Sequence, residues 1–229
     1  MGILIDPGSL AGTLNAINQA FFYGQALTQS ERKRAAKWIA AMQGKPGSYA
    51  GMFAPTRSDL TNGIKVFTGE TVRSNAAVGH ILGEESCRAL ILLDVADGAV
   101  KDALDRATLG MLRRLRQTET PSKVHGLYCC GICSPAYWRH VAVGGLDRNE
   151  ERLAAGMKAL KSHRIGNGRW RRFQFFYTLL ALSELDLKSA VEEMRYAAPA
   201  VELYLKRTIG KSRLSERRQV ICRRILAKC

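Results

Sequence analysis

AKWIAAMQGKPGSY (residues 36–49) and MKALKSHRIGNGRW (residues 157–170) share one pattern: apolar residues at helical spacing, a short polar loop, then glycine, one residue and an aromatic side chain. A looser copy with a longer loop leads to Gly126 and Tyr128. The aromatic residues of the three copies are Tyr49, Tyr128 and Trp170. Their spacing fits units of about 40 residues, with one degenerate copy between the first two. Recurring helix pairs of this kind predict an all-α chain built from helical hairpins.

Helical periodicity continues outside these copies, and the alternation typical of strands is scarce. Thr28 and Glu31 have the spacing of a capping box, and Asp147 and Glu150 repeat it. We expect about ten helices and take residues 1–229 as one helical-repeat domain. Residues 55–71 are expected to be irregular. Further helices are expected at about residues 10–21 (opened by Asp6 and Pro7), 84–95 (stopped by Gly98), 100–115, 134–143, 176–183, 187–196, 199–208 and 215–226.

The composition places this chain among globular proteins. It has 229 residues, 46% of them hydrophobic, and can bury a substantial core. The longest apolar stretch, around residues 175–182, is far shorter than the roughly 18 residues that a membrane span needs. The first ten residues lack the basic and apolar segments of a secretory signal. These observations predict a cytoplasmic protein without a transmembrane helix, in which the six cysteines are reduced thiols or metal ligands.

Positive charge is concentrated near the carboxyl end of the sequence. The net charge is +15, and about residues 206–229 are expected to form a basic helical segment with one acidic residue, Glu216. Such a field attracts nucleic acid, phosphorylated ligands, an acidic membrane surface or an acidic protein, but a solvated, solubilising helix has the same composition. The residues that we expect to bind a polyanion are Arg213, Arg217, Arg218, Arg223 and Arg224.

Gln43, Gly47 and Tyr49 of the first copy resemble the repeat of squalene cyclases and protein prenyltransferases, which is Gln, three residues, Gly, one residue, Trp. The resemblance implies helical hairpins that close into an α/α toroid around a cavity for an apolar or isoprenoid-type ligand. The third copy has Arg164 in place of the Gln, and 229 residues supply few hairpins. We therefore expect a partial toroid or an open curved array, with a HEAT-like solenoid as the alternative. The candidate ligand-binding residues are Tyr49, Tyr128, Trp170, Phe176 and Tyr177.

Two short-range pairs of polar residues are candidates for chemistry. The Asp-x-Asp-Asp signature of the cyclases is absent, and the nearest acidic pair is Asp94 and Asp97. These two can share a helix face and bind a cation or hold a proton, or can face solvent at a helix end. His80 and Glu84, four residues apart, can act as metal ligands or form a hydrogen-bonded pair, and we favour the pair. Whether the chain is an enzyme stays open.

HGLYCCGICSPAYWRH (residues 125–140) is the densest group of metal-binding residue types. Zinc favours thiolate and imidazole ligands, and the two-residue gap between Cys130 and Cys133 lets both sulfurs reach one ion. The expected zinc ligands are Cys130, Cys133, His125 and His140. A redox dithiol is less favoured because no strand precedes the pair. The alternative is that Cys129 and its neighbours simply pack a loop between helices.

Three functions follow from these patterns, in descending order of preference. The first is a prenyltransferase-like toroid protein that binds an apolar small molecule in a central cavity. The second is a basic helical-repeat protein that binds nucleic acid along a concave surface. The third is a non-catalytic scaffold that docks an acidic partner through the basic segment at about residues 206–229.

Overall fold

The computed structural model describes residues 4–120, 122–207 and 212–229, and these residues confirm the all-α prediction. Their regular elements are α1 (Leu10–Phe22), α2 (Gln29–Ala40), the 3₁₀-helix η1 (Tyr49–Gly51), α3 (Arg57–Asn62), β1 (Ile64–Lys65), β2 (Thr71–Val72), α4 (Asn75–Leu93), α5 (Gly98–Arg116), α6 (Ser134–Ala142), α7 (Asn149–Lys161), α8 (Phe175–Glu184), α9 (Lys188–Arg207) and α10 (Arg213–Ala227). The two strands form one short antiparallel hairpin, with Ile64 opposite Val72.

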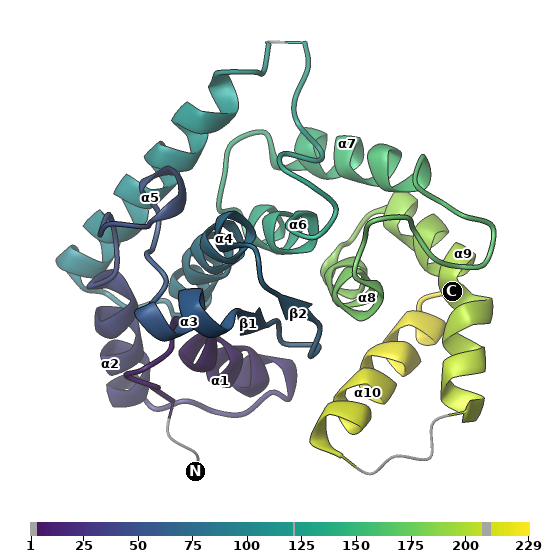
Figure 1. Cartoon of the computed structure of the whole chain (residues 1–229), viewed down its shortest axis with the longest axis horizontal. Coiled ribbons are helices and arrows are strands. Elements are labelled where there is room, and N and C mark those ends of the chain that lie inside the picture. Colours follow the sequence, from purple (N-terminus) through teal and green to yellow (C-terminus); the bar gives the residue numbers. More distant parts are fainter. Residues whose placement is uncertain (1–3, 121, 208–211) are drawn as a thin grey trace.

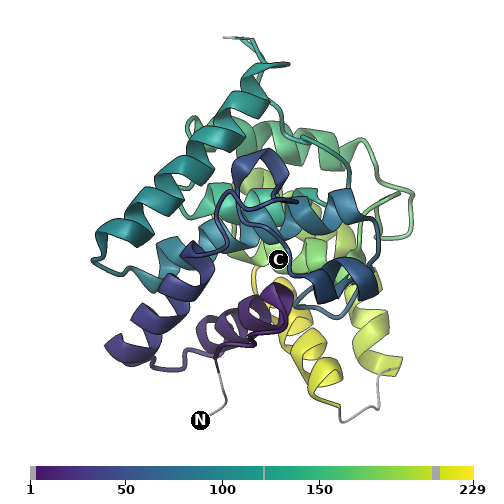
Figure 2. The ribbon, with the colours of Figure 1, turned by 60° about the vertical axis from the view of Figure 1, so that its left-hand side comes forward.

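The helices form an inner and an outer set (Figure 1). In the inner set α1, α4, α6, α8 and α10 follow one another, and each packs against the next. The outer helices α2 and α5 pack together beside α4, and α7 and α9 pack together beside α6 and α8. Figure 2 shows α2 and α5 again on one side of α4. No helix among the described residues combines the length and apolar character that a bilayer crossing requires.

The loops that leave α2, α5 and α7 each form a side-chain bond to the next outer helix along the chain. Three residues beyond the ends of α2, α5 and α7 lie Gln43, Glu119 and Arg164. The side-chain pairs are Gln43 Oε1 with Arg106 Nε of α5 (2.7 Å), Glu119 Oε1 with Arg152 Nη1 of α7 (2.5 Å) and Arg164 Nη2 with Glu193 Oε1 of α9 (2.8 Å). The three loops therefore use equivalent positions, although the residue types and charges differ.

A charged and polar cluster lies between the inner helices. Arg139 of α6 forms an ion pair with Glu85 of α4 and with Glu184 of α8. It also donates to Asn18 of α1 at 3.0 Å, so that one guanidinium reaches three helices. Arg139 is only 2% exposed. We call this group the inner polar cluster, and its members are Asn18, Glu85, Arg88, Arg139, Tyr177 and Glu184.

Several expected helix boundaries agree with the structure and others are wrong. The capping box of Thr28 and Glu31 is present, and α5 covers the expected segment. The first helix starts at Leu10, because Ser9 caps it and Asp6 does not. Gly98 begins α5 instead of ending α4, because Asp97 caps it. Asp147 and Glu150 form no capping box, since α7 begins after Arg148 without a side-chain cap.

Two larger differences have a packing origin. Helix α4 begins at Asn75, well before the expected residue 84, although Gly79 and Gly83 disfavour a helix. Gly83 lies so close to Met52 that an added Cβ would be 2.5 Å from the methionine methyl group, so this glycine permits close packing. Helix α9 runs through Pro199, where two helices were expected. The contacts of α9 with α7, α8 and α10 outweigh the single backbone bond that proline removes.

Residues 55–71 are not wholly irregular, since they contain α3, β1 and the start of β2. Thr56 and Asp59 form a capping box for α3, and Asp59 also accepts bonds from Ser9 and from the backbone of Leu10. This carboxylate ties the short α3 to the start of α1. The last residue of the expected helix 199–208 and residues 208–211 of the basic segment lie outside the described residues.

Gly110 of α5 provides a test of the packing between α5 and η1. An added Cβ at Gly110 would lie 2.0 Å from the carbonyl oxygen of Ala50. We expect Gly110→Ala to lower the free energy of unfolding by about 1–3 kcal/mol, because the two backbones must separate. Gly98→Ala is the matched control in the same helix, since its Cβ would meet nothing within 4 Å. Urea unfolding of both variants measures the difference, and equal stabilities would contradict the packing described.

Candidate metal centre

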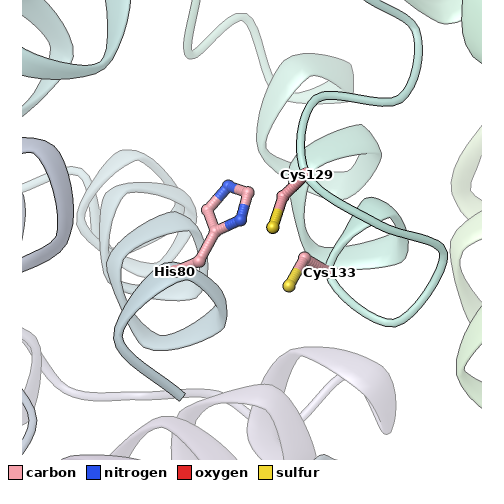
Figure 3. Close-up of side chains that lie close together, drawn as sticks. All are labelled: His80, Cys129 and Cys133. Atoms are coloured by element: carbon pink, nitrogen blue, oxygen red, sulfur yellow. The ribbon is translucent and has the colours of Figure 1, made fainter. Parts of the chain in front are cut away.

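His80, Cys129 and Cys133 come together from distant parts of the sequence (Figure 3). His80 lies in α4, Cys129 in the loop between α5 and α6, and Cys133 immediately before α6. One nitrogen of His80 and the two sulfurs all lie within 4.8 Å of one another. His80 and Cys133 are buried and Cys129 is exposed. The cluster is therefore anchored in the interior and reaches the surface on one side.

The loop that carries the cysteines is held by bonds to α6. Trp138 Nε1 donates to the carbonyl oxygen of Gly126 at 2.7 Å, and the Tyr137 hydroxyl donates to that of His125 at 3.0 Å. Gly131 permits a close approach, because an added Cβ would lie 2.5 Å from the carbonyl oxygen of Arg172. These contacts place Cys129 over α4.

A buried carboxylate orients the imidazole of His80. Its Nε2 lies 3.1 Å from Glu84 Oε1, and the other oxygen of Glu84 lies 2.5 Å from His140 Nδ1. The second ring nitrogen, His80 Nδ1, is buried and has no hydrogen-bond partner. Figure 3 shows a ring nitrogen of His80 facing the two sulfurs. The favoured hydrogen-bonded pair of His80 and Glu84 is thus confirmed, and it leaves Nδ1 free.

The surroundings of His80 and Glu84 favour the charged form of each residue. Burial is the largest influence on His80 and lowers its pKa, but the Cys129 sulfur and the Glu84 carboxylate together raise that pKa to about 9. Burial raises the pKa of Glu84, and the two histidines outweigh it and lower that pKa to about 2. Glu84 is therefore a carboxylate that accepts hydrogen bonds from both rings.

Cys130 lies beside the cluster but is not one of its three converging groups. Its sulfur is 3.5 Å from that of Cys133, and it is exposed. The Cys133 thiol donates to the Cys130 sulfur and, with backbone N–H groups, lowers the pKa of Cys130 to about 5. The same contact raises the pKa of Cys133.

Two tyrosines of the repeated pattern cover the imidazole. The ring of Tyr49 stacks on His80 with centroids 4.4 Å apart, and Tyr128 meets His80 edge-on at 5.5 Å. Burial and the Tyr128 hydroxyl raise the pKa of Tyr49, and the positive charge of the nearby Arg114 opposes this rise. Both tyrosines are half-buried, so aromatic rings and one arginine border the exposed side of the cluster.

The expected histidine ligands lie elsewhere. His125 Nε2 is 2.8 Å from the Thr118 hydroxyl, and His125 is not part of the converging group. His140 bonds to Glu84, which in turn bonds to His80, so it contacts the cluster only indirectly. His80 and Cys129 take the places that the sequence interpretation assigned to His125 and Cys130. The spacing of His80 and Glu84 along a helix was the available signal, but it does not reveal what the second ring nitrogen faces.

The remaining aromatic and acidic candidates are dispersed. Trp170 donates to Glu193 at 2.8 Å and packs against Phe175, and Tyr177 donates to Glu85 within the inner polar cluster. Phe176 packs edge-on against Tyr204. Asp97 caps α5 and pairs with Lys37 at 3.2 Å. Asp94 is the exposed residue that ends α4.

Three of the five candidate polyanion-binding arginines donate to backbone carbonyl oxygens of other elements. Arg217 donates to the carbonyl oxygen of Phe67, Arg218 to that of Thr68 at 2.8 Å, and Arg224 to that of Phe22 at 2.6 Å. These contacts join α10 to α1 and to the strand hairpin. Arg223 donates to Gln219 of its own helix at 3.2 Å, and Arg213, Arg223 and Arg224 are exposed.

Comparisons with protein families, curated proteins and solved structures give no match to this chain.

Proposed function

We propose that this chain binds one zinc ion through His80 Nδ1 and the sulfurs of Cys129 and Cys133. Two observations carry this proposal: His80 Nδ1 is buried without a hydrogen-bond partner, and a ring nitrogen of His80 lies within 4.8 Å of both sulfurs. A buried polar atom without a partner is costly, and a metal ion between these three atoms removes that cost. Thiolate and imidazole are the ligands that zinc prefers.

The spacing of the three atoms fits this ion. Zinc bonds of about 2.3 Å to sulfur and 2.0 Å to nitrogen place tetrahedral ligand atoms roughly 3.5–3.8 Å apart. An inward movement on the order of 1 Å, within reach of side-chain rotation, brings the observed group to that spacing. Metal-binding histidines commonly donate their other ring N–H to a carboxylate, as His80 does to Glu84. Glu84 is itself held by His140, so the imidazole is oriented before metal binds.

Three protein ligands leave a fourth position on a tetrahedral ion. Catalytic zinc sites have this arrangement, whereas structural sites are closed by four protein ligands. The exposure of Cys129 places the fourth position on the solvent side, next to Tyr49, Tyr128 and Arg114. The proposed centre can therefore accept an exogenous ligand atom, and the arginine favours a ligand that carries negative charge.

Cobalt substitution and elemental analysis test this proposal. The reduced chain should bind one zinc ion, and the cobalt form should show thiolate charge-transfer bands and the visible bands of a tetrahedral site. Cys129→Ser, Cys133→Ser and His80→Ala should each lose at least about tenfold in zinc affinity, because each removes one ligand. Cys229→Ser is the matched control, since Cys229 is an exposed cysteine that lies just after α10 and does not belong to the cluster.

Cys130→Ser separates an open from a closed site. If Cys130→Ser keeps its zinc affinity, the ion has three protein ligands. If its zinc affinity falls as far as that of Cys133→Ser, Cys130 is a fourth ligand and the site has no open position. Cys129, His80 and Glu84 also match the three members of a catalytic triad: a thiol nucleophile, a base and a carboxylate that orients the base. A chain that binds no zinc but shows rapid alkylation of Cys129 would therefore overturn the metal proposal in favour of thiol chemistry.

We further infer that the helical hairpins form a partial α/α toroid, as the resemblance to cyclases and prenyltransferases implies. The succession of inner helices and the equivalent bonds from Gln43, Glu119 and Arg164 support this inference. The binding of an apolar or isoprenoid-type ligand stays a prediction. The inner polar cluster occupies the space between α1, α4, α6 and α8, which favours the metal centre as the functional site.

A further inference from the structure

Cys130 and Cys133 have the geometry of a dithiol that can close to a disulfide. Their sulfurs are 3.5 Å apart, and an S–S bond of about 2.0 Å requires a shift on the order of 1.5 Å. The two cysteines flank a short turn at the start of α6, where the Cys130 carbonyl oxygen accepts bonds from the N–H groups of Cys133 and Ser134. This turn holds the two side chains together whether or not a metal is bound.

The neighbouring Cys129 is a poor alternative partner for Cys130. Adjacent Cα atoms are about 3.8 Å apart, which is shorter than the roughly 4.4–6.8 Å that disulfides span. Accessibility also differs within the dithiol, since Cys130 is exposed and Cys133 is buried. An oxidant from solvent therefore reacts with Cys130 first, and Cys133 can then displace the part of the oxidant that is bound to the Cys130 sulfur.

We propose that Cys130 and Cys133 form a redox-active dithiol whose oxidation by a low-molecular-weight disulfide, such as glutathione disulfide, withdraws Cys133 from the zinc centre. The coupling to zinc rests on the proposed metal-binding function, whereas the disulfide itself does not. Cys133 is the shared residue, because its sulfur lies within 4.8 Å of a ring nitrogen of His80 and 3.5 Å from the Cys130 sulfur. A sulfur in a disulfide no longer supplies the thiolate that zinc requires.

The chemistry takes two exchange steps. The Cys130 thiolate attacks one sulfur of the oxidant, the oxidant's S–S bond breaks, and one thiolate leaves, so that a mixed disulfide forms on Cys130. The Cys133 thiolate then attacks the Cys130 sulfur and the second thiolate leaves. The two protein sulfurs lose two electrons and one small disulfide gains them, so that two small thiolates leave and take up protons from solvent. The ion, left with His80 and Cys129, is released.

Oxidation of the zinc-loaded full chain with glutathione disulfide tests the proposal. Released zinc is measured with a chromogenic chelator, and disulfides are mapped by mass spectrometry after alkylation. We expect one zinc ion released for each Cys130–Cys133 disulfide, and release at least about tenfold slower in Cys130→Ser, which keeps the three ligands but lacks the attacking thiol. Cys229→Ser should behave as the unmodified chain does.

The outcomes distinguish this inference from the metal proposal. A Cys130–Cys133 disulfide that forms while zinc stays bound would overturn the coupling. Zinc release at the same rate from Cys130→Ser, or disulfides that exclude Cys130, would overturn the dithiol. If the reduced chain binds no zinc at all, the metal proposal fails, and the mass-spectrometric map still decides whether Cys130 and Cys133 pair.

Discussion

Arg139→Ala is expected to lower the free energy of unfolding by about 3–5 kcal/mol, the cost of breaking a buried ion pair from one side. The guanidinium is buried and bonds to Glu85, Glu184 and Asn18. Its removal leaves Glu85, only 5% exposed, without its cationic partner. Urea unfolding at neutral pH measures the change.

Lys101→Ala is the matched control for this prediction. Lys101 pairs with Asp105 at 2.6 Å, but both side chains are more than half exposed. Exposed pairs contribute only about 0–1 kcal/mol, so the control should change stability little. A combined Glu85→Gln and Arg139→Met variant should recover part of the loss, because no unpaired charge is then buried. Equal effects of Arg139→Ala and Lys101→Ala would show that the inner polar cluster does not stabilise the fold.

Glu84→Gln is expected to weaken zinc binding by about 10- to 100-fold without removing a ligand. The amide has nearly the shape of the carboxylate, but it has only one oxygen to accept a hydrogen bond from His80 or His140. The imidazole then loses its fixed orientation and part of its basicity. Competition against a chromogenic chelator measures the affinity, and thermal unfolding of the metal-free variant reports whether the fold is retained.

Glu150→Gln makes the same chemical change at an exposed position of α7 and should leave zinc affinity unchanged. If Glu84→Gln also binds zinc as tightly as the unmodified chain, Glu84 does not orient His80. If its affinity falls only because the metal-free variant unfolds, the carboxylate has a structural role in place of a metal-orienting one.

The helices could be predicted from the sequence where one face is polar. Helix α5 is amphipathic along its length, and its buried residues Val100, Met111 and Leu115 are those that helical spacing selects. Helix α4 is buried on nearly every side, so its first turns show no such alternation of faces. The contact of Gly83 with Met52 explains why a glycine stands within this buried helix.

The candidate site could be predicted in part. The cysteines marked the right loop, and the spacing of His80 and Glu84 marked a helical pair. The two observations could not be joined, because the packing of α4 against α6 brings His80 to the cysteines. Loop conformation decides whether Cys129 or Cys130 faces the imidazole, and residue spacing carries no information on it. The conformation of the same loop also turns His125 toward Thr118 and away from the cysteines.

The inner polar cluster also restricts how this chain can fold during synthesis. Arg139 of α6 needs Glu184, and Glu85 receives a hydrogen bond from Tyr177, but both partners belong to α8. A nascent chain that has only reached α7 can pair Arg139 with Glu85 but lacks Glu184 and Tyr177, so we expect α1, α4 and α6 to pack less stably. Final assembly of the amino-terminal half must therefore wait until α8 leaves the ribosome, and shortened chains that end before Phe175 should be easily digested by proteases.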